Sequence, residues 1–488
     1  MRRRLGPWPA VLLASVLMLA GCAGNAGRPG DDGADRAQAP TPSGVSGPSN
    51  TASSGTGRAA DSPSGSASAG RSATLPNWPT YHRTKSRAGH LRTAPGGPLH
   101  RAWTQRLRGA VYGEPLLVGG TLIVATERNY VYGLDPRTGR HRWRVHLGAP
   151  QPLSGLPCGN IDPLGITGTP AYDHRTGSVF VVAETLGGHH TLWALAAHSG
   201  QRRWHRGLDV LPNRNREAEQ QRSALLVTHG RVIVTFGGLA GDCDNYVGYA
   251  TSVATDGQGT LHHYAVPTAR EAGIWAPPGP VRGRNGNVYL ATGNGAELNG
   301  RWDKSDSVTE LSPVRLRRLA VFAPSTWRAD NAADLDLGSS SPVPVNHRIV
   351  ITGKRGTVYL LRPGLGGVGS ALDTLDGCAA FGSATVVRHT VLMPCLGQSA
   401  IRALHVGTSS LRWGWTASGV YGSPVIAGNR VYVADRFSGD LVVLSLATGK
   451  VLQRVHAGSL PHFPSQAVSG HWVFVPTLTG VTAFTPSR

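Results

Sequence analysis

Four cysteines could form covalent cross-links: Cys158, Cys243, Cys378 and Cys395. No two of them have the short ligand spacing that zinc sites prefer, so a metal site is disfavoured. An even number of cysteines in an exported chain favours two disulfides. We prefer the pairing Cys158–Cys243, between loops of neighbouring repeats, and Cys378–Cys395, across the first half of one repeat. The other two connectivities stay open.

Disulfides require an oxidising compartment, and the N-terminus indicates export. Arg2, Arg3 and Arg4 precede a short apolar run, Val11 to Ala20, which is too short to span a bilayer and is typical of a cleaved signal. The run ends in Leu19-Ala20-Gly21-Cys22, which resembles a bacterial lipobox. The resemblance implies removal of residues 1–21 and a diacylated Cys22, a two-chain membrane anchor. The alternative is an ordinary secretory signal with a chance cysteine.

Residues 22–75 are predicted to form a flexible tether. Most of them are Gly, Ser, Ala or Pro and none is aromatic, so the segment cannot bury enough surface to offset its ordering entropy. As a random coil it would reach about 40 Å. We therefore expect a lipoprotein on the extracytoplasmic face of the cell membrane, with residues 76–488 as its folded part.

Composition limits the architecture of that folded part. The chain has 488 residues, with 65 Gly and 34 Pro, too many helix breakers for a long bundle or coiled coil. It also exceeds the usual size of a single core, which favours several domains or a repeat. The net charge of +20 suits anionic lipids or wall polymers, whereas nucleic acid is a poor partner for an exported chain without a binding motif.

A repeat runs through residues 99–486. Apolar runs ending at Leu134, Leu195, Leu404 and Leu444 are each followed, nine positions later, by Trp143, Trp204, Trp413 or Gln453. Thr138-Gly139 and its counterparts supply the positive φ of a hairpin, so each unit is predicted to be a four-stranded antiparallel sheet. Eight units begin near residues 111, 167, 223, 274, 338, 381, 419 and 463.

The last unit, Phe463 to Pro486, contains only three strands, whereas Leu99 to Trp103 has an outer-strand pattern with no unit before it. We expect this N-terminal strand to complete the last unit and close the ring, which protects the sheet edges. The predicted fold is all-β, an eight-bladed β-propeller.

The repeat resembles that of the pyrroloquinoline-quinone (PQQ) propellers of the quinoprotein alcohol dehydrogenase-like superfamily. Asn77-Trp78-Pro79-Thr80-Tyr81-His82, with Ala88-Gly89 behind it, is similar to the leader that precedes the first blade in that family. The family includes periplasmic dehydrogenases that bind PQQ and calcium, and outer-membrane assembly lipoproteins that bind neither. The fold alone does not choose between them.

Four segments resemble site positions of the dehydrogenases. The segment around Lys354 resembles the one whose basic residue contacts the quinone, and Ala291-Thr292-Gly293-Asn294-Gly295 resembles the one that gives calcium an Asn ligand. Asp334 or Asp336 would be the base that takes the alcohol proton, and Glu184 would be a carboxylate ligand of calcium. Alternatively, the two aspartates are turn residues and Asn294 takes a left-handed turn.

The sequence also departs from the dehydrogenase pattern. It has no adjacent-cysteine disulfide, no Cys-x-x-Cys-His haem site, and no identifiable tryptophan to stack under the quinone; Tyr246-Val247-Gly248-Tyr249 lies where some relatives have one. We therefore favour a binding or assembly scaffold without a catalytic cofactor, whose blade loops hold a protein or cell-wall partner. The alternative is a PQQ- and calcium-dependent dehydrogenase of alcohols or sugars.

Overall fold

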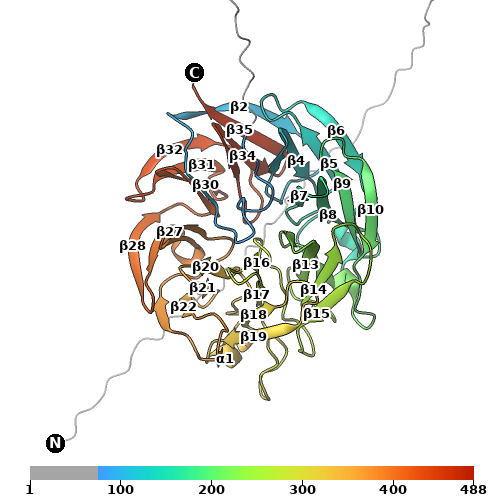
Figure 1. Cartoon of the computed structure of the whole chain (residues 1–488), viewed down its shortest axis with the longest axis vertical. Coiled ribbons are helices and arrows are strands. Elements are labelled where there is room, and N and C mark those ends of the chain that lie inside the picture. Colours follow the sequence, from blue (N-terminus) through green and yellow to red (C-terminus); the bar gives the residue numbers. More distant parts are fainter. Residues whose placement is uncertain (1–74, 488) are drawn as a thin grey trace, which may run out of the picture. The chain divides into compact units, whose positions relative to one another are not determined.

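The computed structural model describes residues 75–487. The predicted signal 1–21, Cys22 and nearly all of the tether lie outside the described residues. The described chain is an eight-bladed β-propeller of four-stranded antiparallel sheets, as the repeat predicted (Figure 1). No helix within it is both long and apolar enough to cross a membrane.

The blades follow one another along the chain. Blades 1 to 4 contain, from the innermost strand outward, β3 (Leu116–Val118), β4 (Thr121–Ala125), β5 (Tyr130–Leu134) and β6 (His141–His146); β7 (Ala171–Asp173), β8 (Ser178–Thr185), β9 (His189–Ala196) and β10 (Arg202–Gly207); β12 (Leu226–Thr228), β13 (Arg231–Gly238), β14 (Tyr249–Ala254) and β15 (His262–Ala265); and β16 (Val281–Arg282), β17 (Val288–Thr292), β18 (Ser307–Leu311) and β19 (Arg318–Ala323).

Blades 5 to 8 repeat this order. They contain β20 (Val343–Val345), β21 (Arg348–Thr352), β22 (Thr357–Leu361) and β24 (Asp373–Asp376); β25 (Thr385–Val387), β26 (Thr390–Cys395), β27 (Ala400–Val406) and β28 (Leu411–Ser418); β29 (Pro424–Ala427), β30 (Arg430–Asp435), β31 (Asp440–Ser445) and β32 (Val451–His456); and β33 (Ala467–Ser469), β34 (Trp472–Thr477), β35 (Gly480–Pro486) and β2 (Leu99–Arg106). Short additions are β1 (His90–Leu91), β11 (Glu219–Gln220), β23 (Gly367–Val368) and α1 (Trp327–Ala332).

The N-terminal strand closes the ring, which confirms the prediction from Trp103. β2 pairs antiparallel with β35, and Leu99 lies opposite Pro486 at one end of the ladder. In Figure 1 the blue β2 lies along the red β35, so the two ends of the described chain share one sheet. Each blade packs its two faces against its neighbours, and the buried aliphatic side chains of the strands form the core between them.

The outer-strand tryptophans link neighbouring blades. The indole of Trp143 in blade 1 lies on Gly200 in the hairpin of blade 2, where an added Cβ would approach Trp143 Cδ2 to 2.9 Å. Trp103 lies on Gly139 in the same way. These turn glycines have positive φ and leave no space for a Cβ atom beside the indole. Only glycine tolerates both that backbone conformation and that close approach. In blade 6 the predicted Trp413 lies on the outer strand β28, and a second tryptophan of that strand, Trp415, makes the contact with Gly449 of the next blade.

The leader closes one end of the central channel. Tyr172 and Arg282 donate from their backbone N–H groups to the carbonyls of Pro79 and Lys85, so the leader crosses the innermost strands of several blades. At its centre Glu114 accepts hydrogen bonds from the indole of Trp78 and from the backbone N–H of His82. Burial raises the pKa of Glu114 to about 7. The leader therefore acts as a plug at this end of the channel, and the opposite mouth stays open.

Candidate functional site

A pocket of about 250 Å³ opens at the unplugged mouth of the ring. Its walls come from the loops that join the second strand to the third within a blade and from the connections between blades. Charged and aromatic side chains line it together, a combination typical of ligand sites. The lining includes Arg222, Asp242, Trp275, Asp334, Lys354, Phe381 and Phe463.

Lys354 lies between two of the predicted site carboxylates. Its Nζ is 2.8 Å from Asp336 Oδ2 and also contacts Asp334 Oδ1. Asn294 Nδ2 donates to the same Asp334 oxygen at 2.6 Å. The structure thus brings together Lys354, Asn294, Asp334 and Asp336, which are four of the five residues that the resemblance assigned to one site; the fifth is Glu184.

Burial sets the electrostatics of this cluster. Asp336 is fully buried, and burial raises the pKa of its carboxyl while the charge of Lys354 lowers it. Burial also opposes the charge of Lys354, but Asp336 and Asp334 outweigh it and raise the pKa of the ammonium group. The lysine is therefore firmly charged. Asp334 has a side chain 67% exposed and is the member that a ligand can reach.

Glu184 belongs to a different cluster. It lies near the end of β8, opposite His190 in the β8–β9 ladder, and its Oε2 is 3.3 Å from His190 Nε2. His190 Nδ1 lies 3.0 Å from Asp209 Oδ1 on its other side. Burial opposes the charge of His190, but the flanking carboxylates raise its pKa to about 10. Glu184 thus pairs with a cross-strand histidine six residues downstream, and it is not among the residues that line the pocket with Lys354.

The residues around Lys354 do not fit calcium. Calcium takes six to eight oxygen ligands, whereas here the ammonium group of Lys354 already occupies the space between Asp334 and Asp336. Asn294 turns its amide nitrogen, not its oxygen, toward Asp334. No group of three His, Cys, Asp or Glu side chains in residues 75–487 is arranged to hold a metal ion. We derive no step through calcium.

Trp275 is the pocket tryptophan that the sequence did not identify. Three glycines from different parts of the chain enclose its ring, and added Cβ atoms at Gly237 in β13 and at Gly293 after β17 would lie 2.7 Å from Cε3 and 2.6 Å from Cη2. Gly273, two residues before it, lies even closer. Tyr246, at the position where some relatives have a tryptophan, donates its hydroxyl hydrogen to Asp242. Two of these glycines, Gly237 and Gly293, are far from Trp275 in the sequence and form no local pattern with it, which is why the sequence alone did not reveal Trp275.

The other wall of the pocket is aromatic and basic. Phe381 and Phe463 stack with centroids 5.9 Å apart and an interplanar angle of 4°. The guanidinium of Arg222 lies 4.7 Å from the Phe463 centroid, a cation–π contact. Burial lowers the pKa of Arg222 to about 10. The pocket therefore has acidic groups paired with a lysine on one side, and aromatic rings with an arginine on the other.

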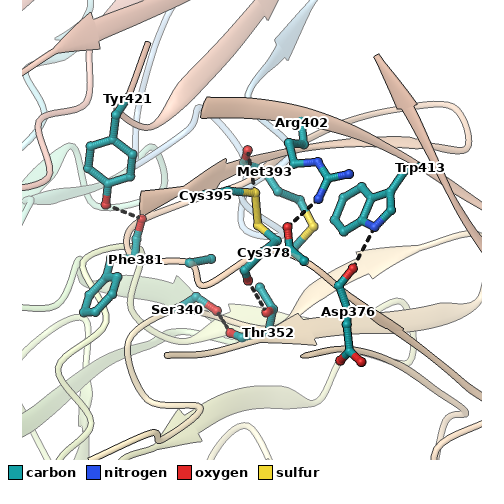
Figure 2. The surroundings of a disulfide bond; sticks show 12 residues. Ser340, Thr352, Asp376, Cys378, Phe381, Met393, Cys395, Arg402, Trp413 and Tyr421 are labelled. Atoms are coloured by element: carbon teal, nitrogen blue, oxygen red, sulfur yellow. Dashed lines mark hydrogen bonds between the residues drawn. A yellow bond between two sulfur atoms is a disulfide. The ribbon is translucent and has the colours of Figure 1, made fainter. Parts of the chain in front are cut away.

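Both disulfides brace loops of this pocket, and both have the pairing that the sequence favoured. Cys158–Cys243 has a Cα–Cα distance of 6.2 Å and fixes the loop that carries Asp242. Cys378–Cys395 has a Cα–Cα distance of 4.8 Å and fixes the segment that leads to Phe381. Figure 2 shows this second bridge with its neighbours.

The second bridge is part of a wider network. Thr352 Oγ1 donates to the carbonyl of Cys378 at 2.8 Å, and the hydroxyl of Tyr421 donates to the carbonyl of Phe381 at 3.2 Å. Because Thr352 ends the strand that precedes Lys354, the network ties the lysine loop to the phenylalanine wall (Figure 2). The pocket is thus preorganised by covalent and hydrogen bonds.

Residues 94–240 match the sequence model of a family described as outer membrane protein assembly factor BamB. A quinohemoprotein alcohol dehydrogenase from Pseudomonas putida HK5 is similar in structure, with a TM-score of 0.66 and 17% identity over 84% of this chain and 80% of that one. The corresponding enzyme from Comamonas testosteroni gives 0.65 and 18% over 85% and 82%.

BamB from Moraxella catarrhalis gives a TM-score of 0.56 and 16% identity over 80% of this chain and 100% of that one. No match is found among curated protein sequences. Identities of this size show the fold alone. The chain is a PQQ-repeat β-propeller, and solved structures of that fold include both dehydrogenases and an assembly factor.

Proposed function

We propose that this chain is a membrane-anchored extracytoplasmic lipoprotein that acts as a binding or assembly scaffold, and that the pocket at the open mouth of the ring is its recognition site. The anchor is the diacylated Cys22 that the lipobox resemblance implies. The partner is a protein or cell-wall component that inserts a protruding group between the blade loops. Nucleic acid is not a partner in this proposal.

One observation carries the choice of binding over catalysis: Lys354 already neutralises the carboxylates that would have to act as the base. Asp336 is fully buried and cannot touch a substrate. Asp334 is exposed but contacts both Lys354 and Asn294. A carboxylate stabilised by an ammonium ion and an amide hydrogen bond is a poor acceptor for a further proton.

The lining suits a group with an apolar plane and polar edges. Trp275, Phe381 and Phe463 offer ring faces, while Lys354 and Arg222 offer fixed positive charge. Because two disulfides hold the loops, little ordering entropy is lost when a partner binds. This preorganisation favours recognition of a preformed partner segment.

A site-specific photocrosslinker tests the scaffold directly. With p-benzoylphenylalanine in place of Phe463, illumination of intact cells should give a defined cross-linked product. The same probe in place of Leu319, an exposed residue of the outer strand β19, should not give that product. Products that are identical at the two positions, or absent at Phe463, would refute a pocket-centred scaffold.

A second candidate is PQQ-dependent oxidation of an alcohol or sugar. The observation that favours it is Trp275 beside Lys354 in one pocket. In such an enzyme the quinone would supply the two-electron oxidant, Trp275 would face its ring plane, Lys354 would donate to its oxygens, and Asp334 would take the alcohol proton. Dye-linked oxidation after reconstitution with PQQ tests this candidate.

A further inference from the structure

The face opposite the pocket is strongly basic. This face, here called the turn face, consists of the turns that join the first strand to the second and the third to the fourth in each blade. Exposed basic residues occupy these turns all round the ring, in six blades: Arg140, Arg175, Arg315, Arg362, Arg388 and Lys450. Among the turn-face residues of the described chain, the acidic residue that is exposed is Asp256, in the β14–β15 turn.

The two faces differ in how far their charges are balanced, because the pocket face carries exposed carboxylates together with exposed arginines such as Arg128, Arg301 and Arg328. The pocket face carries most of the exposed carboxylates, among them Asp162, Asp244 and Asp334. On the turn face the positive charges are close enough to repel one another. Burial and the nearby Arg282 lower the pKa of Lys85, and burial with Arg282 and Lys85 lowers the pKa of His229. Such a concentration of charge attracts an extended anionic surface.

The described chain also begins on the turn face. Leu75 lies against Gly470 in the β33–β34 turn, and the backbone N–H of Gly119 in the β3–β4 turn donates to Asn77 Oδ1 at 3.0 Å. Leu75, where the described chain begins, therefore lies on the turn face. A tether attached to a membrane through Cys22 would draw the turn face, and not the pocket face, toward that membrane.

We infer that the turn face is a membrane-docking surface that binds the phosphate headgroups of anionic lipids. A hollow of about 210 Å³ on this face is lined by the basic residues Arg83, Lys85 and His174 and by one buried carboxylate, Asp173. The basic groups outnumber the carboxylate, so the hollow can receive a headgroup. Docking in this way keeps the pocket mouth directed away from the membrane, where a partner can reach it. The direction of the tether rests on the anchor in the proposed function, but the charged surface does not.

Vesicle flotation tests the docking surface without the lipid anchor. The full chain carrying Cys22→Ser should bind vesicles that contain phosphatidylglycerol, should not bind pure phosphatidylcholine vesicles, and should dissociate as salt rises. Each basic residue removed near an anionic membrane lowers partitioning about fivefold. Arg284 is a further exposed residue of the turn face, in the β16–β17 turn. Arg175→Gln, Arg284→Gln and Arg388→Gln together should therefore lower partitioning about a hundredfold.

The matched control removes three exposed arginines from the pocket face: Arg128→Gln, Arg301→Gln and Arg328→Gln. It should leave partitioning nearly unchanged. Equal losses in the two triple variants, equal binding to neutral vesicles, or equally tight binding to soluble polyphosphate would overturn the inference. Palmitate labelling of the wild-type chain tests the anchor separately, so its failure would leave the docking surface standing.

Discussion

Replacing Lys354 by Met removes the positive charge between two carboxylates and should destabilise the fold in a pH-dependent way. Asp336 would keep a fully buried carboxylate without its cation, a situation that typically costs about 3–5 kcal/mol. The side chain can escape this cost by binding a proton. Protonation costs about 1.4 kcal/mol for each pH unit above the unfolded pKa of aspartate, which amounts to about 1 kcal/mol at pH 4.5 and about 5 kcal/mol at pH 7.5.

The sign follows from linkage. Without Lys354 the folded pKa of Asp336 rises further above its unfolded value, so the stability associated with its proton is present at low pH and is lost as pH rises. The variant should therefore lose about 1 kcal/mol at pH 4.5 and about 3–5 kcal/mol at pH 7.5. Urea denaturation followed by tryptophan fluorescence at the two pH values measures both losses.

Two further variants make this experiment decisive. Adding Asp336→Asn to Lys354→Met removes the buried charge and should abolish the pH dependence of the loss. Lys450→Met changes an exposed lysine in a hairpin turn and should alter the free energy of unfolding by less than about 0.5 kcal/mol. Lys354 does not neutralise a buried Asp336 carboxylate if Lys354→Met lowers the free energy of unfolding equally at both pH values. The same holds if the double variant keeps the pH dependence.

The blade contacts and the disulfide give two more predictions. Gly200→Ala places a Cβ against Trp143, whereas Gly230→Ala has the same positive φ but nothing within 4 Å. Backbone strain should cost each variant about 1–2 kcal/mol of stability, and overpacking against Trp143 should cost Gly200→Ala about 1–3 kcal/mol more. Thermal unfolding compares the two variants, and equal melting temperatures would refute the contact between Trp143 and Gly200. Changing Cys378 and Cys395 to Ser opens a loop of sequence separation 17 and should cost about 3 kcal/mol; urea midpoints check this, and an unchanged midpoint would contradict it.

The fold was predictable from the sequence because the propeller repeats a local signal. An apolar run followed nine positions later by a tryptophan, or by Gln453 in one case, recurs in four of the units, and the unpaired Leu99–Trp103 pattern indicates how the ring closes. The disulfide pairing was also accessible, because blade order places Cys158 and Cys243 on one face. In blade 6 the predicted Trp413 does lie on the outer strand, but the sequence did not indicate that Trp415 on the same strand makes the contact with the next blade.

The candidate site was predictable only in part. Lys354, Asn294, Asp334 and Asp336 converge as the resemblance implied, although Asn294 does not adopt the left-handed turn considered as an alternative. The position of Glu184 could not be judged without its cross-strand neighbour.

The features that the sequence did not predict depend on contacts between residues far apart in the chain. The role of the leader depends on contacts between His82 and residues about three hundred positions away, such as Ser383. No local pattern records contacts of that range. The pocket tryptophan was missed for the same reason.

Reconstitution with PQQ in the presence of calcium, followed by dye-linked oxidation of alcohols and sugars, tests most directly whether the pocket binds or catalyses. A pocket whose carboxylates are already neutralised by Lys354 should give no turnover above that of a Trp275→Ala variant, with or without calcium. Calcium-dependent turnover that is lost in Trp275→Ala and in Asp334→Asn would contradict the scaffold proposal and establish a quinoprotein dehydrogenase.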